Sequence, residues 1–146
     1  ARLPVMSVLE EILYQQFELV ELRVVADKDM QGAEGYTCPD GEFIAIAEKV
    51  YEGALEGNGR DRFTVAHELG HLILHSKQPL QRNTSNVEAK AYRCSEPQAN
   101  QFAAELLMPR KFIISSDNET TIIEKHGVSN EAAMLRLRFL RGKKLI

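Results

Sequence analysis

The 146-residue sequence has no tryptophan, only two cysteines and no long apolar run. Cys38 and Cys94 allow at most one disulfide, which in a domain of this size favours two reduced thiols in a cytosolic protein. The longest apolar stretches, such as residues 43–47, fall far short of the roughly 18 residues that a transmembrane helix needs. A basic region followed by an apolar run is missing from the start, so no secretory signal is predicted. We therefore expect no membrane-spanning helix and a cytoplasmic location.

The composition that remains is that of an ordinary globular domain. Apolar residues make up 44% and charged residues 27% of the chain, which excludes disordered, collagen-like and coiled-coil proteins. We expect a single domain over residues 1–146, because a chain of this length buries roughly 70% of its unfolded surface. The net charge of −3 is uneven, since residues 110–146 hold 8 basic and 4 acidic groups and residues 1–109 hold 10 and 17. We therefore distinguish a core over 1–109 from a C-terminal helical segment over 110–146.

Hydrophobic periodicity predicts a mixture of helices and strands. Apolar residues at helical spacing predict helices over residues 3–17, 60–75, 95–108, 119–126 and 130–140. The third of these helices is expected to begin at Ser95 as N-cap and to end at Pro109. Apolar and β-branched residues predict strands over 20–25 and 42–47. Glycine, proline or polar side chains predict loops over 35–41, 53–59 and 77–93. The pattern indicates an α+β fold.

The predicted helix over residues 60–75 carries the pattern His-Glu-x-x-His at positions 67–71. Four helical residues turn the chain through about 400°, so the imidazoles of His67 and His71 lie on one face, within reach of one ion. Glu68 lies next to that face, where its carboxylate can reach a metal-bound water without acting as a ligand. Chance placement gives roughly 0.01 expected matches. We therefore prefer a metal site to the alternative of two hydrogen-bonded structural histidines.

Two histidines do not complete a catalytic zinc site, which usually has three protein ligands and an exchangeable water. A third ligand is expected downstream, and Glu96 begins the next predicted helix 25 residues after His71. Glu105 and Cys94 compete with Glu96 for this role. Cys94 would make the site sensitive to oxidation if its thiol were reactive, and a plain buried thiol is the simpler interpretation.

Side chains near Glu96 suggest how the two helices approach each other. Asn100 lies four residues after Glu96 on the same face, where its amide can hydrogen-bond an imidazole. Ala99 and Ala103, with Gly70 opposite, are small enough to permit close approach of the two helices. We therefore expect the second helix to cross the first at the metal-binding histidines.

Two sequence blocks, FTVAHELGHLILH over residues 63–75 and EPQANQFAAELLMP over residues 96–109, closely resemble the ImmA/IrrE family of metallopeptidases. Members of this family are compact gluzincins, and both blocks match in order and spacing. The weaker match extends from Leu3 to Arg138, which is nearly the whole chain. The resemblance implies a single zincin-like α+β domain, in which a small sheet packs beside the metal-binding helix and further helices lie on its other side.

The resemblance also implies the ligands and the catalytic base. One Zn²⁺ would be held by His67, His71 and Glu96. Glu68 would act as the general base that takes a proton from the metal-bound water. Asn100 stands where a gluzincin has an orienting aspartate, and as an amide it would form a weaker hydrogen bond.

The group that stabilises the oxyanion and the surface that binds the substrate are left open. Tyr92, His75 and His126 are candidates for contacts with the substrate or the transition state, and a structural role is the simpler account of each. A substrate segment is expected to lie extended along an edge of the sheet. The strand over residues 42–47 is the candidate edge, with an interior position as the alternative.

Family members are often encoded beside helix-turn-helix regulators, and the better understood ones cleave or inactivate a repressor of a mobile element or stress response. The resemblance therefore implies a zinc-dependent endopeptidase. Its protein substrate would be a helix-turn-helix transcriptional repressor encoded nearby.

Two other functions compete with this one. Residues 121–136 have the pattern of a helix-turn-helix, and the second helix bears Arg136, Arg138 and Arg141, so contact with DNA is an alternative. It is less favoured because such helix pairs often only pack. The other alternative is a zinc-bound regulatory module that acts by binding without proteolysis, for which Glu68→Gln would retain function.

Overall fold

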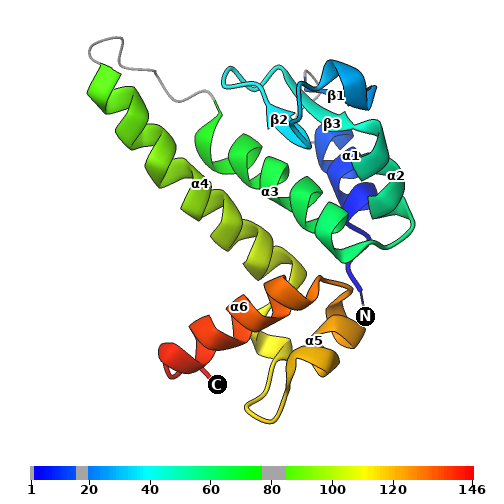
Figure 1. Cartoon of the computed structure of the whole chain (residues 1–146). Helices are drawn as coiled ribbons and strands as arrows, with labels where there is room; N and C mark the ends of the chain where they lie inside the picture. The colour runs from blue at the N-terminus through cyan, green and yellow to red at the C-terminus, as the bar shows by residue number, and fades with distance from the viewer. Residues whose placement is uncertain (1, 16–19, 77–84) are drawn as a thin grey trace.

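The computed structural model describes residues 2–15, 20–76 and 85–146, without the side chains of residues 14, 15 and 85–94 (Figure 1). The helices are α1 (Val5–Gln15), α2 (Glu48–Leu55), α3 (Gly59–His75), α4 (Ser85–Leu107), α5 (Glu119–His126) and α6 (Asn130–Gly142). The strands are β1 (Glu21–Val25), β2 (Gly35–Thr37) and β3 (Phe43–Ala47). Short 3₁₀ helices follow β1 (Asp27–Asp29) and α4 (Arg110–Phe112). The predicted α+β class is confirmed.

The three strands form one sheet in the order β1-β3-β2. The central strand β3 runs parallel to β1 and antiparallel to β2. The expected edge position of the strand over residues 42–47 is therefore wrong, and its interior alternative is right. The burial of all residues from Ile44 to Ala47 agrees with a strand that has a neighbour on both sides. The segment predicted as a loop over 35–41 contains the short edge strand β2. This strand was not predicted because three residues are too few to show an alternating pattern.

Helix α3 lies between the sheet and α4 (Figure 1). It begins where the Asn58 side chain accepts hydrogen bonds from two backbone N–H groups, those of Arg60 and Asp61. Helix α4 runs antiparallel beside it, and a Cβ added at Gly70 would lie 3.2 Å from the backbone of Ala99. The predicted close approach of two small-residue faces is confirmed, because nothing larger than hydrogen fits at position 70 without a shift.

One helix begins earlier than predicted, and another was not predicted. Helix α4 begins at Ser85 rather than at Ser95, and Pro97 lies inside it. Residues 85–93 were assigned to a loop because they are polar, although alanine, glutamate and lysine among them are good helix formers. The rest of that predicted loop, 77–84, lies outside the described residues. Helix α2 was missed because Gly53 and Gly57 suggested a loop, yet only Gly57 has a positive φ, of 91°.

The C-terminal helices were predicted almost to the residue. Gly127 ends α5 in the left-handed conformation, with φ of 65°, and Ser129 caps α6 by accepting from the N–H of Ala132. A single cluster of buried apolar residues extends from Val5 in α1 to Leu140 in α6. The division of the chain at residue 109 stays a prediction. Among the described residues, no helix is both long and apolar enough to span a membrane.

Candidate metal centre

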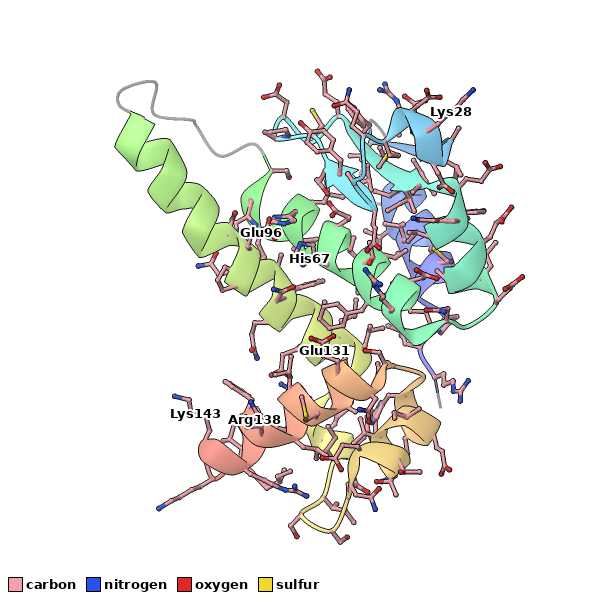
Figure 2. All side chains as sticks on the ribbon, in the orientation of Figure 1. Lys28, His67, Glu96, Glu131, Arg138 and Lys143 are labelled. Carbon is pink, nitrogen blue, oxygen red and sulfur yellow. The ribbon has the colours of Figure 1, made fainter. Side chains whose placement is uncertain are left out.

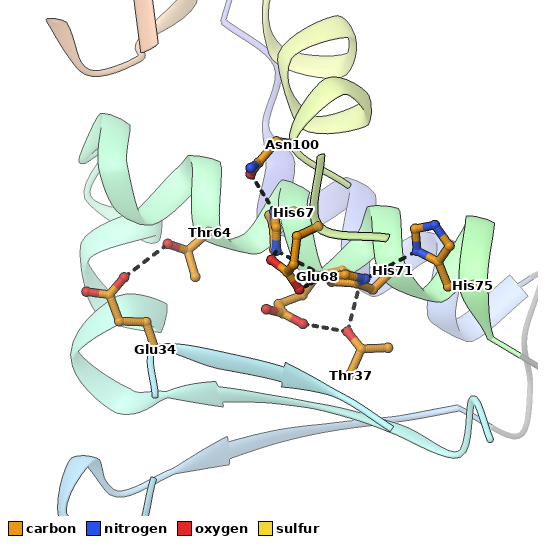
Figure 3. A network of polar contacts seen from close by, with 9 residues as sticks. Glu34, Thr37, Thr64, His67, Glu68, His71, His75 and Asn100 are labelled. Atoms are coloured by element: carbon orange, nitrogen blue, oxygen red, sulfur yellow. Dashed lines mark hydrogen bonds and ion pairs between the residues drawn. The ribbon is translucent and has the colours of Figure 1, made fainter. Parts of the chain in front are cut away.

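The side chains of His67, His71 and Glu96 meet between α3 and α4 (Figures 2 and 3). The two imidazole Nε2 atoms lie 3.1 Å apart. One Glu96 carboxylate oxygen lies 3.2 Å from Nε2 of His67, and the other lies 2.9 Å from Nε2 of His71. Ligands at zinc's usual bond lengths and tetrahedral angles lie about 3.3 Å from one another. The spacing of these atoms therefore suits a single ion of this size.

The hydrogen bonds behind His67 show which of its nitrogen atoms is available to a cation. Its Nδ1 lies 2.8 Å from Oδ1 of Asn100 in α4. An amide oxygen only accepts hydrogen bonds, so Nδ1 carries a proton, and in the neutral imidazole Nε2 then presents a lone pair to the carboxylate of Glu96. A lone pair and a carboxylate at this distance repel each other unless a cation lies between them. The two imidazole nitrogens and the Glu96 carboxylate therefore fit Zn²⁺ as ligands. Asn100 forms the hydrogen bond to an imidazole that the sequence predicted.

Partial burial favours the neutral form of His71 in this cluster. The side chains of His67 and His71 are each 16% exposed, and that of Glu96 is 37% exposed. Burial, together with the neighbouring His67, lowers the pKa of His71. The neutral imidazole is the form that binds a metal ion, so the environment of His71 favours ligation.

Glu68 is buried beside the cluster and is held by the sheet. The Thr37 hydroxyl of β2 lies 2.7 Å from Oε2 of Glu68 and 3.0 Å from its backbone oxygen (Figure 3). Burial raises the pKa of the Glu68 carboxyl, and the hydrogen bond from Thr37 partly opposes that rise. A raised pKa makes the carboxylate a stronger base, which suits a group that accepts a proton from water.

The backbone of β2 also lies against this carboxylate. A Cβ at Gly35 would lie 2.7 Å from Cγ of Glu68, so only glycine leaves the side chain where it is. The sequence analysis missed both Gly35 and Thr37, because it assigned their segment to a loop. A short apolar–polar alternation before Gly41 was the only available signal.

Glu105, the other carboxylate considered as the third ligand, forms an ion pair elsewhere in the fold. Both Glu105 oxygens accept from the guanidinium of Arg136 in α6, at 2.8 and 2.7 Å. That pair lowers the pKa of Glu105, and Glu105 is not in the group whose ligand atoms converge among the described residues. The side chain of Cys94 lies outside the described residues.

The three candidates for substrate contact have different surroundings. His75 lies one turn after His71, and the Nδ1 atoms of the two rings are 3.2 Å apart. His126 is buried at the end of α5, where burial lowers its pKa and its backbone oxygen accepts from Arg62. Among the described residues, His126 is not part of the converging group. The side chain of Tyr92 is outside the described part of the chain.

An apolar cleft opens next to the cluster. It has a volume of about 670 Å³ and lies between α3, α4 and α6. Phe63, Leu135 and Phe139 contribute to its largely apolar lining. Asn100, whose amide contacts His67, lines the same cleft. The cleft therefore begins directly behind one of the histidines.

Two of the three arginines that suggested DNA contact have internal partners. Arg136 is 2% exposed and also donates from Nε to the backbone oxygen of Met108 at 3.1 Å. Arg141 donates to the backbone oxygen of Asp117 at 2.7 Å. Arg138 is exposed and projects outward, as Figure 2 shows. The helix pair thus uses its arginines mainly to attach itself to the rest of the fold.

Comparison with known proteins agrees with the geometry. A family model described as the IrrE N-terminal-like domain, Peptidase_M78, matches residues 28–138. None of the curated proteins or solved structures compared with the chain matches it. The matched region contains α3, α4 and the three converging side chains, and the fold is compatible with a compact zincin-like domain. The chain belongs to the ImmA/IrrE family of metallopeptidases.

Proposed function

We propose that this protein is a zinc-dependent endopeptidase of the cytoplasm. The observation that carries the proposal is the convergence of two imidazoles and a carboxylate beside a second, separately held carboxylate. His67, His71 and Glu96 would hold the ion, and Glu68 would act on the substrate. When bound there, Zn²⁺ would supply a Lewis acid that lowers the pKa of a bound water towards about 7 and polarises a peptide carbonyl.

The protein side chains supply the proton transfers. Glu68 would accept the proton of the attacking water and pass it to the leaving amine. The hydrogen bond from Thr37 supports this role because it orients the carboxylate, and burial supports it because it raises the affinity of the carboxylate for a proton. The hydrogen bond from His67 to Asn100 supports the ligand role by directing Nε2 towards Glu96.

Two surfaces are available to bind the polypeptide substrate. Among the described strands, the edge strand β2 pairs with β3 on one side only, so an extended substrate segment could pair with its other edge beside Glu68. The apolar cleft under α6 would take apolar side chains of the same segment, at Leu135 and Phe139 for example. The predicted substrate is a helix-turn-helix transcriptional repressor encoded nearby, in keeping with the family resemblance.

The test is a comparison of two proteins acting on one substrate. Zinc-loaded wild type and Glu68→Gln are incubated separately with the regulator encoded next to this chain, and the products are read by intact mass spectrometry. We expect new fragments with wild type alone, which also give the cleavage position. Zinc binding without fragments from either protein would contradict the peptidase function for this substrate. A stable complex with the intact regulator would then favour the alternative of regulation by binding.

A further inference from the structure

Helix α3 carries a third histidine whose contacts extend the metal centre by two residues. Nδ1 of His75 faces Nδ1 of His71 at 3.2 Å, and the ring centroids are 5.3 Å apart. On its other side, Nε2 of His75 lies 2.8 Å from Oε1 of Gln98 in α4. Gln98, His75 and His71 therefore form a continuous chain of polar contacts that ends at the converging Nε2 atoms.

The chemistry of these three groups fixes where each proton sits. The Gln98 oxygen only accepts, so Nε2 of His75 carries the proton and its Nδ1 has a lone pair. Two facing Nδ1 atoms need one proton between them, and that proton must then belong to His71. A neutral imidazole carries one proton, so Nε2 of His71 is left with its lone pair directed at Glu96, 2.9 Å away.

We propose that His75 and Gln98 are positioning residues that hold His71 in the tautomer able to bind a metal ion. They do for His71 what Asn100 does for His67, so both imidazoles are oriented from α4. If the Gln98 amide were turned around, its N–H would face His75 and the proton order would reverse. Nε2 of His71 would then carry a proton and could not bind the metal. The proposal rests on the proposed function in taking zinc as the ion.

The test uses substitutions that break or preserve the chain of contacts. His75→Phe keeps a ring beside His71 but removes both nitrogens, and Gln98→Leu removes the acceptor at an exposed position. His75→Asn places an amide oxygen where Nδ1 was, so it preserves an acceptor for His71. Gln101→Leu is the matched control, because its amide lies on the same helix and contacts Glu105 instead.

Two readouts are needed, zinc affinity and the tautomer of His71 in the zinc-free protein. In competition with a chromogenic chelator, we expect zinc affinity to fall by about 10- to 100-fold in His75→Phe and by about tenfold in Gln98→Leu. His75→Asn should retain most of the affinity, and Gln101→Leu should match wild type. The tautomer is read in the zinc-free Glu96→Ala background, because the carboxylate 2.9 Å from Nε2 of His71 would otherwise attract a proton to that nitrogen. In long-range ¹H–¹⁵N spectra of this protein, His71 should be protonated on Nδ1 when His75 and Gln98 are intact and shift towards Nε2–H when His75→Phe or Gln98→Leu is added.

The two readouts separate this proposal from the proposed function. Wild-type zinc affinity and an unchanged His71 tautomer in both His75→Phe and Gln98→Leu would overturn the positioning role. If the wild-type protein bound no zinc, the proposed function would fail, but the tautomer of His71 would still decide the proposal. A proton on Nε2 of His71 in the zinc-free Glu96→Ala protein, with His75 and Gln98 intact, would overturn it directly.

Discussion

At position 35 a single methyl group would disturb the proposed general base. A Cβ there would lie 2.7 Å from Cγ and 3.0 Å from Oε1 of Glu68, and the flexible side chain would yield before the backbone. We expect Gly35→Ala to lower peptidase activity by at least about tenfold, because the carboxylate moves away from the attacking water. Zinc affinity should stay within about twofold of wild type, since the converging ligands lie on α3 and α4.

Both quantities are measured on the same preparation, with a fluorogenic substrate and a zinc-competition assay. Gly142→Ala is the control, because a Cβ at that position meets no atom within 4 Å. Full activity in Gly35→Ala would show that Glu68 does not depend on the backbone of β2.

Individual residues also show how far the sequence could predict the site. The two histidines and Asn100 were predictable because a helix repeats every 3.6 residues, so their side chains share faces that can be read from spacing alone. Thr37 was not predictable, because it meets Glu68 across 31 positions through a three-residue strand. Only the assembled sheet brings those two residues together.

At the scale of elements, the bidentate contact between Glu105 and Arg136 joins α4 to α6. The Arg136 side chain is 1% exposed, whereas that of Glu105 is 48% exposed. Removal of the Glu105 carboxylate would leave the buried guanidinium of Arg136 without its partner. An uncompensated buried charge strongly destabilises a fold. The pair therefore fastens the C-terminal helices beside the cleft that they help to form.

We expect Glu105→Ala and Glu96→Ala to have opposite effects. Glu105→Ala should lower the free energy of unfolding by about 2–4 kcal/mol and leave zinc affinity unchanged. Glu96→Ala should abolish tight zinc binding and cost little stability in the absence of zinc, because its side chain is more than one-third exposed. Urea unfolding with chelator present and zinc competition give the two quantities. Weaker zinc binding in Glu105→Ala would restore this residue as a ligand candidate.

The elements differ in how clearly the sequence predicted them. Helix α3 has a capping asparagine and a regular apolar face, so its limits were predicted to within one residue. Five of the first ten residues of α4 are serine, asparagine, glutamate, lysine or arginine, and this segment was assigned to a loop, so the expected boundary at Ser95 was wrong. The secondary structure of a polar segment is difficult to predict, because the main signal in a sequence is the spacing of its apolar residues.

On the scale of the whole molecule, the proposed ion would bind between two successive helices, and its ligands His71 and Glu96 are 25 positions apart in the sequence. His67 and His71 belong to α3 and Glu96 to α4, and both helices contribute to the one apolar core. Unfolding separates the ligands, so an ion that binds only the folded chain stabilises the whole fold. Zinc should therefore change global stability as well as activity.

The size of this effect follows from mass action. A free zinc concentration about a thousand times the dissociation constant stabilises the folded state by about 4 kcal/mol. For a domain of this size, 1 kcal/mol shifts the melting temperature by about 2–4 °C, so we expect a rise of about 10 °C over the chelator-treated protein. Calorimetry at stepped zinc concentrations measures the shift. Glu96→Ala should melt at nearly the same temperature with and without zinc, because one of the two helices then lacks its ligand. A wild-type melting temperature that does not change with zinc would contradict an ion shared between α3 and α4.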